Sequence, residues 1–196
     1  MKNHYVSHFN LPSLSQLTSQ RIQSISPLIN KLKFKDVEED KIFEETKQKI
    51  KAAILFKPLS IEEPVFVDFD YEEIPVRFEQ QFFGHVGKDH YYHTVTYKYT
   101  GDKELFMHTP DRFSYSSSDH GIIEPSKNSI KVIVDLQEIN PEKAKAEANS
   151  LVNLTKNIGE TNSLSIIPWN TAVEKRIDDE MEAKRNELFK IFGTGK

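Results

Sequence analysis

The chain has 196 residues and a mass of 22.7 kDa, with 37% hydrophobic and 29% charged residues. This is the composition of a globular protein of one domain or two small ones, and it excludes collagen-like and low-complexity chains. No apolar run reaches the roughly 18 residues that a membrane-spanning helix needs. The absence of cysteine excludes disulfides, thiolate nucleophiles and cysteine-ligated metals. It is typical of a reducing compartment, so we expect a cytoplasmic protein.

Charge is distributed unevenly along the chain, although the net charge is only −4. The first 35 residues carry five basic and no acidic residues, whereas residues 36–73 carry twelve acidic and five basic residues. A basic surface over the whole protein, typical of nucleic-acid-binding domains, is therefore not expected. Any phosphate-binding site would have to be local.

Two helices are predicted before the first strand. Apolar residues recur every three or four positions over residues 11–32, which predicts one helix with an interruption at Pro27. Asp36 is a suitable N-cap for a second helix, which ends shortly before a proline. We therefore expect an N-terminal helical segment over residues 1–57.

The middle of the chain is predicted to form a sheet. Strands are expected at residues 64–70, 75–83, 90–100, 103–110 and 130–136. Gly101 and Asp102 supply a turn into a short partner strand, and short turns favour antiparallel pairing. Residues 109–129 form a loop of a length that is often functional.

Two long helices are predicted at the end of the chain. Asn140 and Pro141 are a suitable N-cap and first residue for a helix that ends near Gly159. A second helix would run on to Gly193 and pack antiparallel against the first. Strands followed by helices indicate an α+β fold with a mainly antiparallel sheet, N-terminal helices and a long C-terminal helical hairpin. Residues 58–196 would form one compact domain with the first segment.

Histidine and aspartate residues could hold a metal. Five of the seven histidines fall within 36 residues, and the candidate ligands are His90, His93, His108 and Asp111. Such a cluster would support a metal-dependent hydrolase or nuclease, with Asp68 and Asp70 on one face of a strand as further carboxylates. Alternatively, these are ordinary strand and turn histidines, because residues three apart on a strand point to opposite faces.

Aromatic residues with basic neighbours indicate a second alternative, a single-stranded nucleic-acid binder. The candidate contacts are Arg77, Tyr92, Lys98 and Arg112, since exposed aromatic side chains on a sheet can stack on bases. Aromatic residues on strands also serve as core and cross-strand contacts, which is the competing interpretation. Glycine-rich phosphate-binding motifs are absent from the sequence, so we expect no cofactor.

The last predicted helix carries an apolar stripe long enough to pair with its neighbour and still meet a partner. The candidate partner-binding residues are Trp169, Arg176 and Arg185. A protein partner or self-association is expected on this ground, with an intramolecular helix pair as the alternative.

Several segments resemble the N-terminal domain of a group of poorly characterised bacterial proteins. They are residues 96–106 (TYKYTGDKELF), Thr109-Pro110, residues 130–136 and residues 168–193. In that group a GD-x-x-LF hairpin precedes a strand and two helices, the second with an asparagine near its start and a basic pair near its end. Asn170 and Lys184-Arg185 match these positions.

The resemblance covers roughly residues 60–193 and includes no catalytic residue. Members of the group often continue into a restriction-endonuclease-like domain, which here would follow residue 196, and are associated with defence against mobile DNA. The resemblance thus implies a sensing or assembly part of an anti-phage defence system. We expect a non-catalytic recognition and assembly module of a larger bacterial system, and the metal-dependent hydrolase and the nucleic-acid binder remain alternatives.

Overall fold

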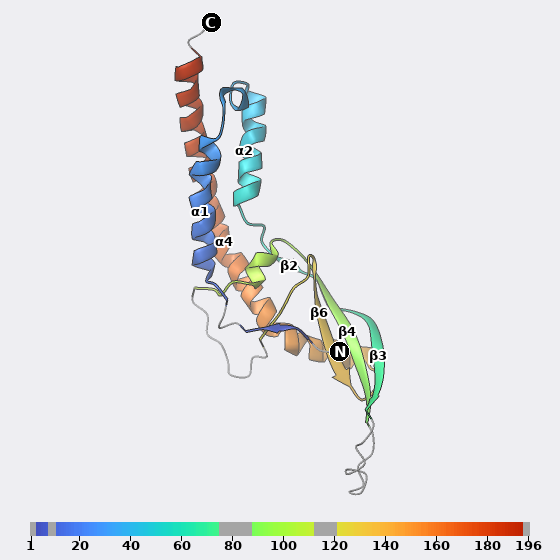
Figure 1. Cartoon of the computed structure of the whole chain (residues 1–196). Helices are drawn as coiled ribbons and strands as arrows, with labels where there is room; N and C mark the ends of the chain where they lie inside the picture. Colours follow the sequence, from blue (N-terminus) through green and yellow to red (C-terminus); the bar gives the residue numbers. More distant parts are fainter. Residues whose placement is uncertain (1–2, 8–10, 75–87, 112–120, 194–196) are drawn as a thin grey trace.

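The computed structural model describes residues 3–7, 11–74, 88–111 and 121–193, and the molecule is elongated (Figure 1). α1 (Leu14–Asn30), α2 (Asp40–Ile54) and the second half of α4 (Pro141–Phe192) lie side by side at one end. The sheet lies at the other end, against the first half of α4. The predicted α+β class is confirmed.

The sheet is antiparallel and has β4 at its centre. Its strands are β2 (Ser60–Ile61), β3 (Val65–Ile74), β4 (Lys88–Thr100) and β6 (Ser129–Leu136). β3 and β6 pair with opposite edges of β4, since Thr96 is opposite Val65 on one side and Lys131 on the other. A separate pair joins β1 (Tyr5–Val6) to β5 (Ile122–Ile123).

Two predicted local structures need correction. The partner strand expected over residues 103–110 is wrong, because its first residues form the 3₁₀ helix η3 (Lys103–Phe106), which buries Leu105 and Phe106. Asp36 does not cap the second helix, because it ends a short 3₁₀ helix, η2 (Phe34–Asp36), and α2 begins at Asp40. The strand expected over residues 75–83 lies outside the described residues.

The predicted C-terminal helical hairpin is also wrong, because α4 is a single helix of 52 residues. Gly159, where a break was expected, is buried in the middle of the helix. A Cβ atom at this position would lie 2.6 Å from the ring of Phe106 and 2.9 Å from Leu59. Glycine costs a helix about 1 kcal/mol. Here it allows the close approach of η3, so its role is packing and not termination.

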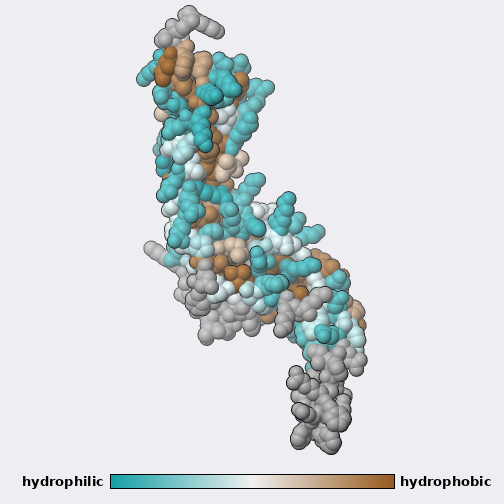
Figure 2. Space-filling model, in the orientation of Figure 1, coloured by the Kyte–Doolittle hydropathy of each residue, from teal (hydrophilic) through white to brown (hydrophobic). Residues whose placement is uncertain are grey.

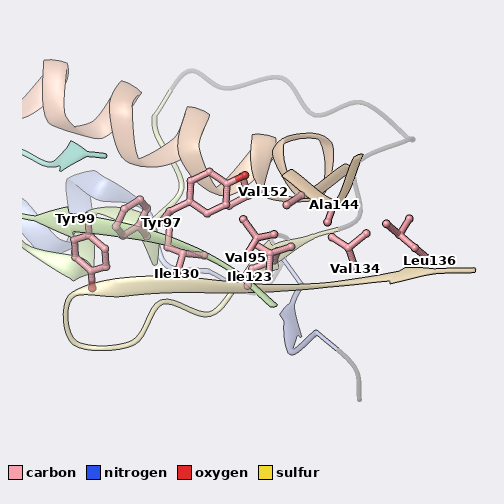
Figure 3. Close-up of a cluster of buried hydrophobic side chains, with 12 residues drawn as sticks. Val95, Tyr97, Tyr99, Ile123, Ile130, Val134, Leu136, Ala144 and Val152 are labelled. Carbon is pink, nitrogen blue, oxygen red and sulfur yellow. The ribbon is translucent and has the colours of Figure 1, made fainter. Parts of the chain in front are cut away.

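The first half of α4 covers one face of the sheet (Figure 3). Small and apolar residues of the helix pack on alternate residues of β4 and β6, and the buried set is Val95, Tyr97, Tyr99, Ile130, Val132, Val134, Leu136, Ala144, Ala148 and Val152. The predicted alternation in β4 is therefore confirmed for this face. The buried Tyr97 hydroxyl donates to Asn149 Oδ1 at 2.9 Å.

The second half of α4 packs on α1 and α2 to form a three-helix bundle. Its core comprises Ile25, Ile29, Val37, Phe43, Ile50, Ile54, Val173, Ile177, Met181 and Leu188. Lys51 of α2 forms ion pairs with Glu174 and Asp178 of α4, at 2.9 and 2.8 Å. Burial alone would lower the Lys51 pKa, but the two carboxylates outweigh it and raise the pKa above 10.5.

Polar residues at the middle of α4 bind the backbone of the segments that connect the bundle to the sheet. These residues are Asn162, Ser163 and Asn170. Asn162 Nδ2 donates to the carbonyl groups of Leu105 and His108, both at 2.7 Å. Ser163 Oγ accepts from the backbone N–H of Leu59, and Asn170 both accepts from the N–H of Phe56 and donates to its carbonyl. These bonds satisfy backbone groups that neither the helices nor the sheet can pair.

We expect Gly159→Ala to destabilise the protein by about 1 kcal/mol or more, because the steric cost against the Phe106 ring exceeds the gain in helix propensity. Urea unfolding would measure this difference. Glu160→Ala, on the exposed side of the same turn, is the control and should change the free energy of unfolding by less than about 0.5 kcal/mol. Equal stability of Gly159→Ala and wild type would contradict the close contact.

Burial raises the pKa of the Tyr97 phenol above its ordinary value of 10.0. The folded state therefore holds this proton more tightly than the unfolded state, and stability falls as pH rises through 10.0 toward the raised value. Tyr97→Phe removes the hydrogen bond of the phenol and should lower the free energy of unfolding by about 1 kcal/mol at neutral pH. Its stability should then fall less than that of the wild type above pH 10, as measured by unfolding at several pH values. A parallel loss in both proteins would contradict this assignment.

Candidate interaction surfaces

His93 joins β4 to the beginning of α4. Its ring is fully buried, and its Nε2 accepts a hydrogen bond from the backbone N–H of Asn140 at 3.1 Å. Nδ1 then carries the proton and donates to the carbonyl of Tyr91 at 2.9 Å. The rings of Phe66 and Phe69 pack on it at 5.8 and 5.9 Å. Both ring nitrogens are thus engaged, Nδ1 within β4 and Nε2 with the N-cap residue of α4.

His90 points to the opposite face of the sheet. Its Nδ1 lies 2.8 Å from a carboxylate oxygen of Asp135, and its ring stacks on Tyr92 at 6.2 Å. Residues 90 and 93 therefore do not face a common site, as the strand geometry predicts.

The other two candidate ligands, His108 and Asp111, each form a hydrogen bond with a different residue nearby. His108 Nδ1 is 2.8 Å from the carbonyl of Glu104, and Asp111 accepts from Ser15 Oγ at 2.6 Å. In the part of the chain that the structure describes, no three His, Cys, Asp or Glu side chains are grouped so that they could hold a metal ion. The structure thus does not bring the candidate ligands together, and it lends the hydrolase alternative no support.

The candidate nucleic-acid residues are only partly described. Arg77 and Arg112 lie outside the described residues. Tyr92 and Lys98 both lie on the face of β4 that points away from α4. Tyr92 is half-buried, and Lys98 is exposed.

That outer face of the sheet is acidic around Tyr92. The cross-strand register places Asp70 and Asp135 beside Tyr92, and Asp68 and Glu72 follow on the same face of β3. Partial shielding from solvent, together with Glu72 and Asp135, raises the pKa of the Tyr92 phenol above its ordinary value. Carboxylates at this density repel phosphates, so this face does not favour a nucleic acid.

Two of the three candidate partner-binding residues, Trp169 and Arg185, pack α4 against other parts of the fold. Trp169 is half-buried and packs on the ring of Phe56 at 5.1 Å. Arg185 pairs with Asp40 of α2 and lies over the ring of Phe43 at 4.6 Å.

Arg176, by contrast, is exposed. It pairs with Glu180 of its own helix at 2.7 Å, which leaves the outer side of its guanidinium open to solvent. Of the three expected partner-binding residues, it is therefore the most accessible.

A more accessible apolar surface lies at the end of the bundle, and we call it the bundle tip. It consists of Phe34, Phe189, Ile191 and Phe192, and Figure 2 shows apolar residues at this end of the molecule. Ile191 and Phe192 are both 57% exposed, and Phe34 contacts Phe189 at 5.2 Å. Ile191 was not among the predicted interaction residues, although it follows Leu188 by three positions and so continues the apolar stripe of α4 beyond its buried part.

A second accessible surface is the β3 edge, which we define as residues 65–72 of β3. In the described residues β3 pairs with β4 alone, so one of its edges carries no strand. Val65, Val67 and Phe69 are 52%, 54% and 39% exposed. The ladder shifts between Phe66 and Asp68, so that Val67 lies in a bulge.

Comparison of the chain with models of known protein families, with curated proteins and with solved structures found no match. The motif residues behind the sequence resemblance have structural roles in this fold. Asp102 accepts from the backbone N–H of Lys57, and Leu105 is buried in η3. Asn170 binds the backbone of Phe56. None of the described helices is sufficiently long and apolar to cross a membrane.

We expect His93→Ala to lower the free energy of unfolding by about 2 kcal/mol or more, because it leaves the Asn140 N–H unpaired and opens a cavity. His90→Ala should cost less than about 1 kcal/mol, since its ion pair is at the surface. Thermal unfolding with and without added Zn²⁺ tests the metal hypothesis on the same proteins. Zn²⁺ should leave the Tm unchanged, and a Zn²⁺-dependent rise that both variants lose would contradict this assignment.

Proposed function

We propose that this chain is a non-catalytic recognition and assembly module, and that it self-associates through the bundle tip. The observation that supports this proposal is the exposure of Phe189, Ile191 and Phe192 beside the partly buried Phe34. Monomeric proteins rarely leave contiguous apolar surface of this kind uncovered unless it meets a partner. Ile191 and Phe192 do not belong to the core of the bundle, because the buried part of α4 ends at Leu188.

The charges around the bundle tip favour a second copy as the partner. The segment between α1 and α2 carries Lys31, Lys33 and Lys35, followed by the acidic residues Glu38 and Glu39. All five are exposed. In a two-fold interface, a basic residue of one copy that faces an acidic residue of the other is matched by the reciprocal pair, so a surface that carries both signs is able to complement itself.

The bundle tip and the sheet are held at opposite ends of α4. A helix of 52 residues is about 78 Å long at 1.5 Å per residue, and its middle is fixed to both halves of the fold. The chain could thus join its own copies at one end and present the sheet at the other. We propose, on the sequence resemblance alone, that such an assembly serves a cytoplasmic anti-phage defence system of a bacterium.

Light scattering of the full chain over a range of concentrations tests the bundle tip. The wild type should form assemblies heavier than the 22.7 kDa monomer, and Ile191→Ser/Phe192→Ser should be monomeric. Circular dichroism should be unchanged, because both side chains are mainly exposed.

Leu164→Ser/Ile167→Ser is the matched control, since it removes two exposed apolar residues of the same helix far from the bundle tip. This control should assemble like the wild type. A wild-type chain that stays monomeric at every concentration, or a control that loses assembly equally, would count against the proposal.

A further inference from the structure

The β3 edge belongs to the sheet, at the other end of the molecule from the bundle tip (Figure 1). β3 is a strand of ten residues that pairs along one side with β4, and no other described residue pairs with its opposite side. Alternate residues of such an edge direct backbone N–H and C=O groups outward. These groups are able to pair with an added strand, which gains affinity from main-chain hydrogen bonds.

The two faces of the β3 edge differ in chemistry. Asp68, Asp70 and Glu72 lie on the outer face, opposite Thr94, Tyr92 and His90 of β4. Phe66 and Phe69 lie on the inner face, where their rings pack against His93. An added strand would therefore meet carboxylates on one face and aromatic rings on the other.

Charge on an edge strand often serves only to prevent aggregation. That interpretation does not account for the apolar side chains beside the charges. Val65 and Val67 are 52% and 54% exposed, and Phe69 is 39% exposed. A purely protective edge gains nothing from exposing these side chains, whereas a docking edge uses them for side-chain contacts.

A second copy of β3 is a poor occupant of this edge. An antiparallel pair centred on Asp70 places Asp68 opposite Glu72 and sets Asp70 against its own copy. Centres on Phe69 or Tyr71 also oppose carboxylates, and a parallel pair in register opposes all of them. Like charges directly opposite each other destabilise a strand pair.

We infer that the β3 edge binds an extended segment of a partner protein in which basic and apolar residues alternate. The segment adds to the sheet as a strand, with its Lys or Arg side chains beside Asp68, Asp70 and Glu72. Its apolar side chains then extend the inner face beside Phe69. Carboxylates occupy every second position of β3 from Asp68 to Glu72. The β3 edge therefore favours a partner segment whose basic residues also occupy every second position.

Fluorescence anisotropy of a labelled peptide tests this inference on the full chain. The peptide is acetyl-KVKVKVK-amide, which carries lysines on one face and valines on the other when extended. Asp68→Asn/Asp70→Asn should weaken its binding about fivefold or more, and added salt should weaken it further. Asp179→Asn/Glu182→Gln removes the same charge from the exposed side of α4 and should bind like the wild type.

Hydrogen exchange with the same peptide shows whether a strand is added. Amides of β3 should gain protection in the complex, because those on the open side become hydrogen-bonded. The isomer acetyl-KKKKVVV-amide has the same charge but cannot separate its lysines from its valines on two faces. Equal affinity for this isomer, absence of binding by KVKVKVK, or binding without protection of β3 would overturn the inference.

Ile191→Ser/Phe192→Ser should still bind the peptide like the wild type. Asp68→Asn/Asp70→Asn should still assemble like the wild type. Failure of one proposal is therefore distinguishable from failure of the other.

Discussion

The arrangement of this protein depends on the close contact between Gly159 of α4 and the ring of Phe106. Gly159 lies between the section of α4 that packs on the sheet, up to Val152, and the section that packs in the bundle core, from Val173 onward. Asn162 and Ser163, within the next turn, bind the backbone of the two connecting segments. A side chain at position 159 would separate these surfaces, and the hydrogen bonds of the next turn would then lengthen.

One continuous helix through both halves gives the molecule its elongated form. Each half has its own apolar core, and each core uses a different section of α4. Two ends with exposed apolar side chains are thereby held apart on a stiff element. The separation is consistent with a protein whose role is to bring partners together, and it places the bundle tip and the β3 edge in independent surroundings.

Several histidine, aspartate and asparagine side chains, which are common in active sites, have structural roles in the part of the chain that the structure describes. His93 accepts from the N-cap residue of α4 through Nε2, while its Nδ1 donates to Tyr91 of its own strand, so the ring attaches the beginning of α4 to the sheet. Asp111 binds Ser15 at the start of α1, and Asn170 binds the segment after α2. Each of these side chains satisfies backbone or side-chain groups where elements meet. Spacing in the sequence could not distinguish such roles from those of metal ligands.

The sequence by itself determined the α+β class, both N-terminal helices, the alternation in β4 and the strand β6, because these depend on the pattern of apolar residues within short segments. It also identified Asp68 and Asp70 as one face of a strand. Only the tertiary structure decided that α4 passes through Gly159, that residues 103–106 form a 3₁₀ helix and that, among the described residues, β3 pairs with β4 alone. A glycine ends a helix or permits close packing according to what lies beside it, and that neighbour, Phe106, is 53 residues away in the chain.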